Sequence, residues 1–158
     1  MNKTRIAIIR ISGNCGLRFV IKDTLKMLRL YKKFTCIVIP NTPAYLGMLK
    51  KVKDFVTWGE IDDKTFTELL LKRGKLPGKQ VISEQYIKAK TKLSVSDFVK
   101  EYFAFKKDLK DIPGLKSFFR LNPPKNGFEK KGTKKPFSMG GVLGYRKDKI
   151  NELIKRMI

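Results

Sequence analysis

The 158-residue sequence contains no histidine, and it has only 14 acidic residues against 36 lysines and arginines. Without histidine it lacks the commonest base at neutral pH and the commonest zinc ligand. The few carboxylates are scattered, so no pair is placed for general acid–base catalysis. The Gly13–Gly16 turn lacks the G-x-G-x-x-G spacing of a dinucleotide site. We therefore expect no enzyme activity, no metal site and no cofactor.

Long apolar runs are also missing. No run approaches the roughly 20 residues that a membrane-spanning helix needs, and we expect no signal peptide. The two cysteines, Cys15 and Cys36, form no Cys-x-x-Cys pair, so reduced thiols are expected. The sequence thus predicts a cytoplasmic protein with no membrane partner and no small-molecule substrate.

Positive charge is what the chain has in excess, with a formal net charge of +22. A protein so basic is attracted to polyanions, with nucleic acid the first candidate and an anionic membrane surface the second. Residues 1–61 and 113–158 each carry 12 cations and 3 anions, whereas residues 62–112 carry 12 and 8. This uneven distribution predicts contact surfaces at the two ends and an ordinary charged surface in the middle.

The first 61 residues alternate between strand and helix patterns. Apolar, β-branched runs at 6–11, 34–39 and 55–58 predict three strands. One helix is predicted from the apolar stripe Leu17, Val20, Ile21, Leu25 and Leu28. A second starts at Pro43, with Thr42 as its N-cap. This order predicts an α+β fold, a small β-α-β-α-β core related to the ferredoxin-like fold, with both helices on one face of the sheet.

A stripe of cations follows the first predicted helix. Arg18, Lys22, Lys26 and Arg29 recur at spacings of four, four and three, which stacks them along one side. No carboxylate lies on the stripe, and Asp23 lies beside it. Two interpretations stay open: the stripe contacts an anionic partner, or it is a solvated face that maintains solubility.

Two further segments complete the single expected structural domain. Residues 62–112 predict a helical insertion packed on the 1–61 core, in which Asp62 caps a helix that Gly74 ends as a left-handed stop. Residues 113–158 predict a basic extension: a strand near Phe119, a Gly/Lys-rich loop and an amphipathic C-terminal helix. The loop's aromatic residues, Phe128, Phe137 and Tyr145, either stack on bases or anchor the loop to the core.

Several of these motifs resemble a known family. The segments Arg5–Arg10, Leu25–Leu30, Pro40–Ala44, Gly47-Met48 and Lys51-Val52 resemble the large-subunit ribosomal protein L-thirty family. In this sequence Asn41 replaces the family's usual Asp, and Arg29 stands where Gly is common. The blocks 119–124, 135–141 and 151–157 resemble the long-chain type of archaea, which is related to eukaryotic ribosomal protein L-seven. The archaeal form fits better because the eukaryotic long basic N-terminal arm is absent.

The resemblance implies a structural constituent of the large ribosomal subunit that binds and stabilises folded rRNA through basic surfaces. The alternative is a free-standing nucleic-acid-binding or RNA-chaperone protein. The implied partners are large-subunit rRNA and neighbouring ribosomal proteins, which places the protein on the cytoplasmic ribosome. The candidate rRNA-binding residues are Arg10, Arg18, Lys22, Lys26, Arg29, Lys50, Lys51, Lys125, Lys130, Lys131, Lys134, Lys135 and Arg146.

Overall fold

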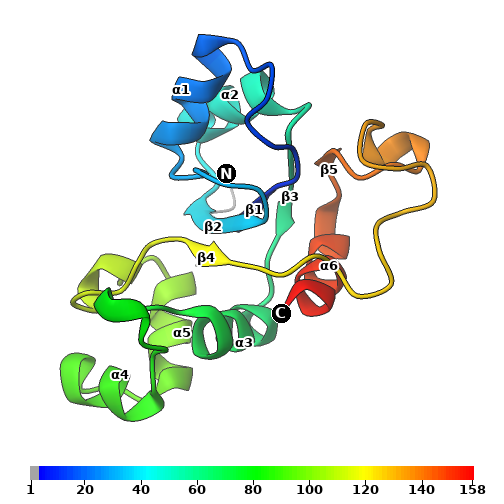
Figure 1. Ribbon diagram of the computed structural model, residues 1–158. Helices are drawn as coiled ribbons and strands as arrows, with labels where there is room; N and C mark the ends of the chain where they lie inside the picture. Colours follow the sequence, from blue (N-terminus) through cyan, green and yellow to red (C-terminus); the bar gives the residue numbers. More distant parts are fainter. Residues whose placement is uncertain (1–3) are drawn as a thin grey trace.

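The computed structural model describes residues 4–158 as a five-stranded sheet with helices on both faces (Figure 1). The strands are β1 (Arg5–Arg10), β2 (Thr35–Pro40), β3 (Val56–Glu60), β4 (Phe119–Arg120) and β5 (Gly144–Tyr145). The α-helices are α1 (Phe19–Met27), α2 (Pro43–Val52), α3 (Asp63–Arg73), α4 (Glu84–Thr91), α5 (Val95–Phe103) and α6 (Ile150–Met157). Short 3₁₀ turns are η1 (Pro77–Lys79), η2 (Leu109–Asp111), η3 (Phe137–Met139) and η4 (Lys147–Lys149). The predicted α+β class is confirmed.

The strand order is β4-β2-β1-β3-β5, with β1 at the centre. Strand β1 runs antiparallel to both neighbours, and Ile8 pairs with Ile37 on one side and Trp58 on the other. Strand β4 adds to β2 in antiparallel fashion, and β5 adds to β3 in parallel. The chain beyond residue 112 therefore supplies both edge strands of a sheet whose centre is the predicted core.

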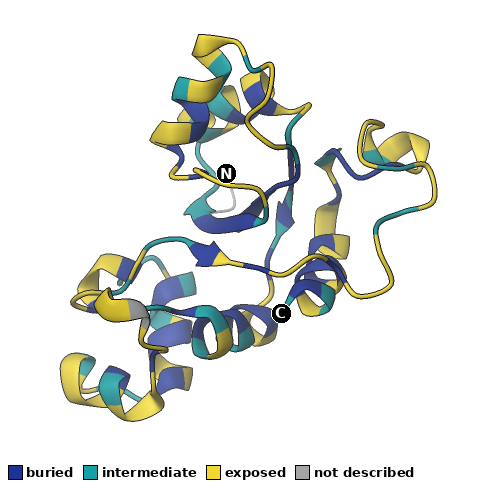
Figure 2. Cartoon of the chain, in the orientation of Figure 1, coloured by how far each residue is buried: buried dark blue, intermediate teal, exposed yellow. Residues whose placement is uncertain are grey.

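Alternation along β1 divides the core into two layers. Ile6 and Ile8 pack with α1 and α2 on one face, as predicted for these two helices. Ala7 and Ile9 face the other way, into a larger cluster formed with α3, α5 and α6. Figure 2 shows the buried residues concentrated along the sheet and the inward sides of these helices. Residues from all three predicted segments share the larger cluster.

The C-terminal helix α6 docks as its apolar pattern predicted. Its four apolar residues Ile150, Leu153, Ile154 and Met157 are fully buried. The amide of Asn151 joins two elements, because its Oδ1 accepts from the Asp62 backbone N–H at 3.1 Å and its Nδ2 donates to the Glu60 carbonyl at 3.1 Å. Gly59 permits this approach, since a Cβ there would overlap the Lys147 carbonyl oxygen.

Two local predictions are corrected. Helix α1 begins at Phe19, and Val20 is 60% exposed instead of buried, because Ile21, Thr24 and Leu25 form the inward side. Helix α3 ends at Arg73 as predicted, but Gly74 has φ −62° and is extended, not left-handed. Glycine is needed there for space, because a Cβ would overlap the Leu70 carbonyl oxygen.

Candidate nucleic-acid interface

Three of the predicted cations lie together on and beside α1. Lys22 and Lys26 are on successive turns, and Arg18 occupies the N-cap position, which preserves the four-residue spacing. All three are exposed, and within residues 4–158 none lies within 4.0 Å of a carboxylate. Cations that have no internal partner remain free to neutralise an external anion. With Phe19, they form what we call the α1 surface.

Phe19 is a residue that sequence reasoning missed. It is 79% exposed in the first turn of α1, next to Arg18. The sequence pattern could have indicated that Phe19 is exposed, because position 19 falls outside the inward stripe that Leu17, Ile21 and Leu25 define. An exposed aromatic ring among cations provides a stacking platform for a base as well as charge for its phosphate.

Arg29 lies beyond the end of α1 and has a different geometry from the other three. Its φ of 57° makes it the left-handed residue that terminates the helix, where the family commonly has glycine. The Leu30 N–H donates to the Leu25 carbonyl at 2.9 Å, which closes the last turn. The Arg29 guanidinium is exposed and donates to Ser117 Oγ at 2.5 Å. Arg29 therefore contacts the segment before β4, and we do not include it in the α1 surface.

Two more candidates, Lys50 and Lys51, lie in the last turn of α2 and are exposed. Cations at this position also interact favourably with the negative end of the helix dipole. Their exposed side chains can contact an external anion. They also stabilise the end of α2, whether or not an anion is bound.

Arg10 is the first of two candidates that the structure moves into the interior. It lies on the same face of β1 as Ile6 and Ile8 and is 2% exposed. Its guanidinium donates to the carbonyls of Ser12, Gly13 and Leu30 at 2.7–2.8 Å, and to Asn14 Oδ1 at 2.6 Å. These bonds hold the turn before α1 and the end of α1 in place. The structure thus corrects the sequence-based placement of Arg10 on an RNA-facing surface.

Replacing Arg10 by methionine is expected to lower the free energy of unfolding by about 2–3 kcal/mol, because the buried Leu30 carbonyl and the part-buried Ser12 and Gly13 carbonyls lose their donor. Arg10→Lys should restore little of this stability, because one ammonium group cannot reach the carbonyls before α1 and the Leu30 carbonyl after it at the same time, as the guanidinium does. Urea denaturation followed by circular dichroism measures both variants. Arg18→Met is the matched control and should leave the midpoint nearly unchanged; equal losses in the Arg10 and Arg18 variants would contradict this assignment.

The second group of cations lies on residues 125–143, which we call the C-terminal loop. Its candidates are all exposed, and they are Lys125, Lys130, Lys131, Lys134 and Lys135. The loop is folded back on itself, since the Phe137 N–H donates to the Leu143 carbonyl at 2.7 Å and the Val142 N–H to the Lys135 carbonyl at 3.0 Å. Figure 2 shows the loop as a mostly exposed projection at one side of the molecule.

Arg146 is the second candidate that the structure places inside, at 2% exposure. It forms a two-pronged pair with Glu129, with Nη1–Oε1 and Nη2–Oε2 distances of 2.8 and 3.4 Å. It also donates to Thr57 Oγ1 and the Val142 carbonyl, at 2.9 and 2.8 Å. Arg146 therefore anchors the C-terminal loop to β3, and the sequence-based assignment of Arg146 to RNA contact is corrected.

The aromatic residues of this region also act as anchors. Phe128 packs on Phe34 with ring centroids 6.0 Å apart, and the Phe137 ring lies 4.6 Å from the Arg146 guanidinium carbon. The Tyr145 hydroxyl donates a hydrogen bond to Glu60 Oε1 at 2.6 Å. Of the two interpretations, these contacts favour anchoring over base stacking.

The predicted cations thus divide into separate groups. The α1 surface and the C-terminal loop occupy different parts of the molecule, and in Figure 1 strands β3 and β5 lie between helix α1 and the loop. A partner that touches both must span this edge of the sheet, which an extended, folded polyanion can do.

Other kinds of site find no support in the described chain. Residues 4–158 contain no group of three or more potential metal ligands placed to hold an ion. Among the same residues, no helix is both long and apolar enough to cross a bilayer. Cys15 is an exposed free thiol, and Cys36 is a buried one whose pKa is raised to about 12 by burial.

Comparison with known proteins identifies the family. The sequence model of "Ribosomal protein L30p/L7e" matches residues 6–56, which is the β-α-β-α-β core up to the start of β3. Over nearly the whole chain, the protein is 48% identical to large ribosomal subunit protein uL30 of Methanococcus maripaludis, a match over 152 residues that covers 96% of this chain and 98% of the relative.

Two further archaeal relatives match to the same extent. The uL30 protein of Methanopyrus kandleri is 48% identical, covering 92% of this chain and 99% of its own length. The uL30 protein of Nanoarchaeum equitans is 47% identical, and the match covers 96% of this chain and 97% of the relative. These matches include the helical insertion and the C-terminal extension, so the resemblance to the long-chain archaeal type is confirmed. The chain belongs to the ribosomal protein L30p/L7e family, whose members are structural, non-enzymatic proteins of the ribosome.

Proposed function

We propose that this protein is a structural constituent of the large ribosomal subunit that binds and stabilises folded large-subunit rRNA. The observation that carries the proposal is the set of exposed cations without carboxylate partners on the α1 surface, held by a helix whose other side is packed on the sheet. Because the helix backbone is already in place, only the side chains lose conformational freedom on binding, and counterions released from RNA supply the driving force.

The contact is expected to read RNA shape more than base sequence. A-form RNA conceals its base edges in a deep, narrow groove, whereas its phosphates and sugars are accessible. The α1 surface and the exposed lysines of the C-terminal loop are the two surfaces we assign to phosphates. Lys50 and Lys51 are further candidates, and Arg29 remains a candidate through its exposed guanidinium.

Neighbouring ribosomal proteins are the second class of partner that we propose. The 62–112 segment carries 12 cations and 8 anions, and part of this charge is paired internally, as between Lys72 and Glu68 at 3.7 Å. A surface of mixed sign attracts phosphates less than the two basic surfaces do. We assign most of it to solvent and to protein contacts.

Sedimentation tests the proposal against a free-standing RNA-chaperone. A ribosomal constituent is expected to co-sediment stoichiometrically with the large subunit and to remain there through a high-salt wash. A chaperone is expected at the top of the gradient or in substoichiometric amounts. Recovery of the protein only in the free fractions would contradict the proposal.

Replacing both Lys22 and Lys26 by glutamine is expected to weaken binding of folded rRNA several-fold. The slope of log affinity against log salt should flatten by about two units, one for each lost phosphate contact. The melting temperature should stay nearly unchanged, because the two side chains are exposed and unpaired. Filter binding across a salt series gives the slope. An unchanged slope would leave α1 as scaffold only.

Charge reversal at single positions tests how charge is divided along the chain. Lys22→Glu and Lys131→Glu are expected to weaken rRNA binding more than Lys72→Glu or Lys100→Glu, because the last two lie on the mixed-charge insertion. All four lysines are exposed, and of the four Lys72 also forms an ion pair, with Glu68. Equal losses at all four positions would show that only total charge matters.

A further inference from the structure

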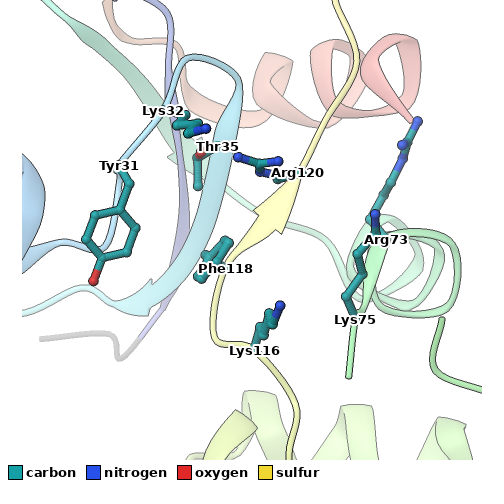
Figure 3. Close-up of a pocket in the computed structure, with 8 residues that line it drawn as sticks. All are labelled: Tyr31, Lys32, Thr35, Arg73, Lys75, Lys116, Phe118 and Arg120. Atoms are coloured by element: carbon teal, nitrogen blue, oxygen red, sulfur yellow. The ribbon is translucent and has the colours of Figure 1, made fainter. Parts of the chain in front are cut away.

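A cleft of about 460 Å³ lies beside β4, where the core, the insertion and the C-terminal segment meet. We call it the β4 cleft. Figure 3 shows its lining side chains around the strand, and they are Tyr31, Lys32, Thr35, Arg73, Lys75, Lys116, Phe118 and Arg120. Its size falls in the range of roughly 300–1,000 Å³ that is usual for ligand sites, which is enough for a nucleotide.

The lining contains five cations and no carboxylate. Arg73 is already used, since its guanidinium donates to an oxygen of Ile158 at 2.5 Å, and Figure 3 shows its side chain running towards α6. The other four cations form no ion pair within residues 4–158, and they are Lys32, Lys75, Lys116 and Arg120. A recess with four unpaired cations is a site for an anion with more than one charged group.

Two aromatic rings stand at one side of this recess. Tyr31 and Phe118 pack edge to face with centroids 6.0 Å apart, and Tyr31 is 47% exposed. The segment that carries Phe118 is tied to the chain after α3, because the Lys116 N–H donates to the Lys75 carbonyl at 3.1 Å. Arg29 fixes the same segment through Ser117. These contacts position Phe118, and the Tyr31 ring packs on Phe118 while keeping a partly free surface.

We infer that the β4 cleft binds an unpaired nucleotide of RNA, with its base against Tyr31 and the adjoining phosphates beside Lys75, Lys116 and Arg120. The inference deepens the proposed function and rests on it. A paired base is already stacked and cannot enter a recess, whereas an extruded base can stack on an aromatic side chain. The cations that line the rest of the cleft then receive the phosphates on either side of that nucleotide.

The test uses the full chain and two fluorescent RNA probes, a single-stranded oligoadenylate of about ten nucleotides and a duplex of about 12 base pairs. Tyr31→Leu is expected to weaken binding of the single strand about five- to tenfold and to leave the duplex within twofold, because one stacking contact is lost. Tyr31→Phe keeps the ring and should stay within twofold of the wild type for both probes.

The charge is tested with Lys75→Gln/Lys116→Gln and a matched control, Lys88→Gln/Lys90→Gln, on the exposed side of α4. The first double variant should flatten the single-strand salt slope by about 1.4, from about 0.7 for each contact, and the control should change it less than half as much. Thermal melting by circular dichroism establishes that every variant folds.

The possible results separate this inference from the proposed function. If Tyr31→Leu weakens both probes equally or neither, or if the two double variants behave alike, the β4 cleft is not a nucleotide site. Binding of folded rRNA by the wild type then still supports the proposed function. If the wild type binds the duplex and not the single strand, the inference is overturned as well. Failure of the wild type to bind folded rRNA would refute the proposed function itself.

Discussion

Raising the salt concentration from about 50 to about 200 mM is expected to weaken the binding of folded rRNA about 10⁴-fold. Of the exposed cations that we assign to phosphate contacts, three lie on the α1 surface and five on the C-terminal loop. If about eight phosphates are neutralised at ~0.9 counterion each, the slope of log affinity against log salt is roughly −7. Filter binding or fluorescence anisotropy across a salt series measures it.

The steepness of this slope distinguishes binding through phosphate neutralisation from binding through uncharged contacts. Chloride and acetate series should give slopes of similar steepness, because the cations displaced come from the RNA. A slope near −1 would show that the exposed lysines and arginines are a solvated surface and that contacts of another kind dominate.

Replacing Glu129 by glutamine is expected to lower the free energy of unfolding by about 3 kcal/mol, because it leaves the Arg146 guanidinium buried without a counter-charge. The side chain of Arg146 is 1% exposed and that of Glu129 is 24% exposed, which places the effect at the low end of the range for a buried pair. Urea denaturation measures the loss. Glu152→Gln, at an exposed acid of α6, is the matched control and should change little.

The same pair predicts how stability changes with pH. Burial alone raises the pKa of Glu129, but hydrogen bonds and charge from Arg146 outweigh burial and hold the pKa below its ordinary value of 4.5. A lowered pKa in the folded state means that this contribution is complete above about pH 4.5 and is lost as the pH falls through the folded-state value. The wild type should lose more stability there than Glu129→Gln; parallel pH profiles would contradict this role.

The core and its general partner were predictable because their signals are local. Strand patterns at 6–11, 34–39 and 55–58 correspond to β1, β2 and β3, and Pro43 after Thr42 starts α2 as expected. The excess of 22 positive charges pointed to a polyanion without reference to any fold. The motif resemblance to the L-thirty family is confirmed, because the relatives match nearly the entire chain.

The exposure of individual cations was harder to predict from sequence. Arg10 follows the alternation of Ile6 and Ile8, so the strand period did place it on a core face. The prediction nevertheless placed Arg10 on the surface, because arginine side chains are usually exposed. Arg146 carried no such signal, since its partner Glu129 is 17 residues away across a loop.

By itself the sequence determined the order of core elements, the family and the attraction to a polyanion, because periodicity, motifs and net charge are properties of short segments or of the whole composition. Only the tertiary structure decided which cations face outwards and that residues near 31, 75 and 116–120 line one cleft. Those residues meet through the pairing of β4 with β2 and the packing of α3 below the sheet. Such long-range contacts depend on how the whole chain closes on its core, which no local pattern records.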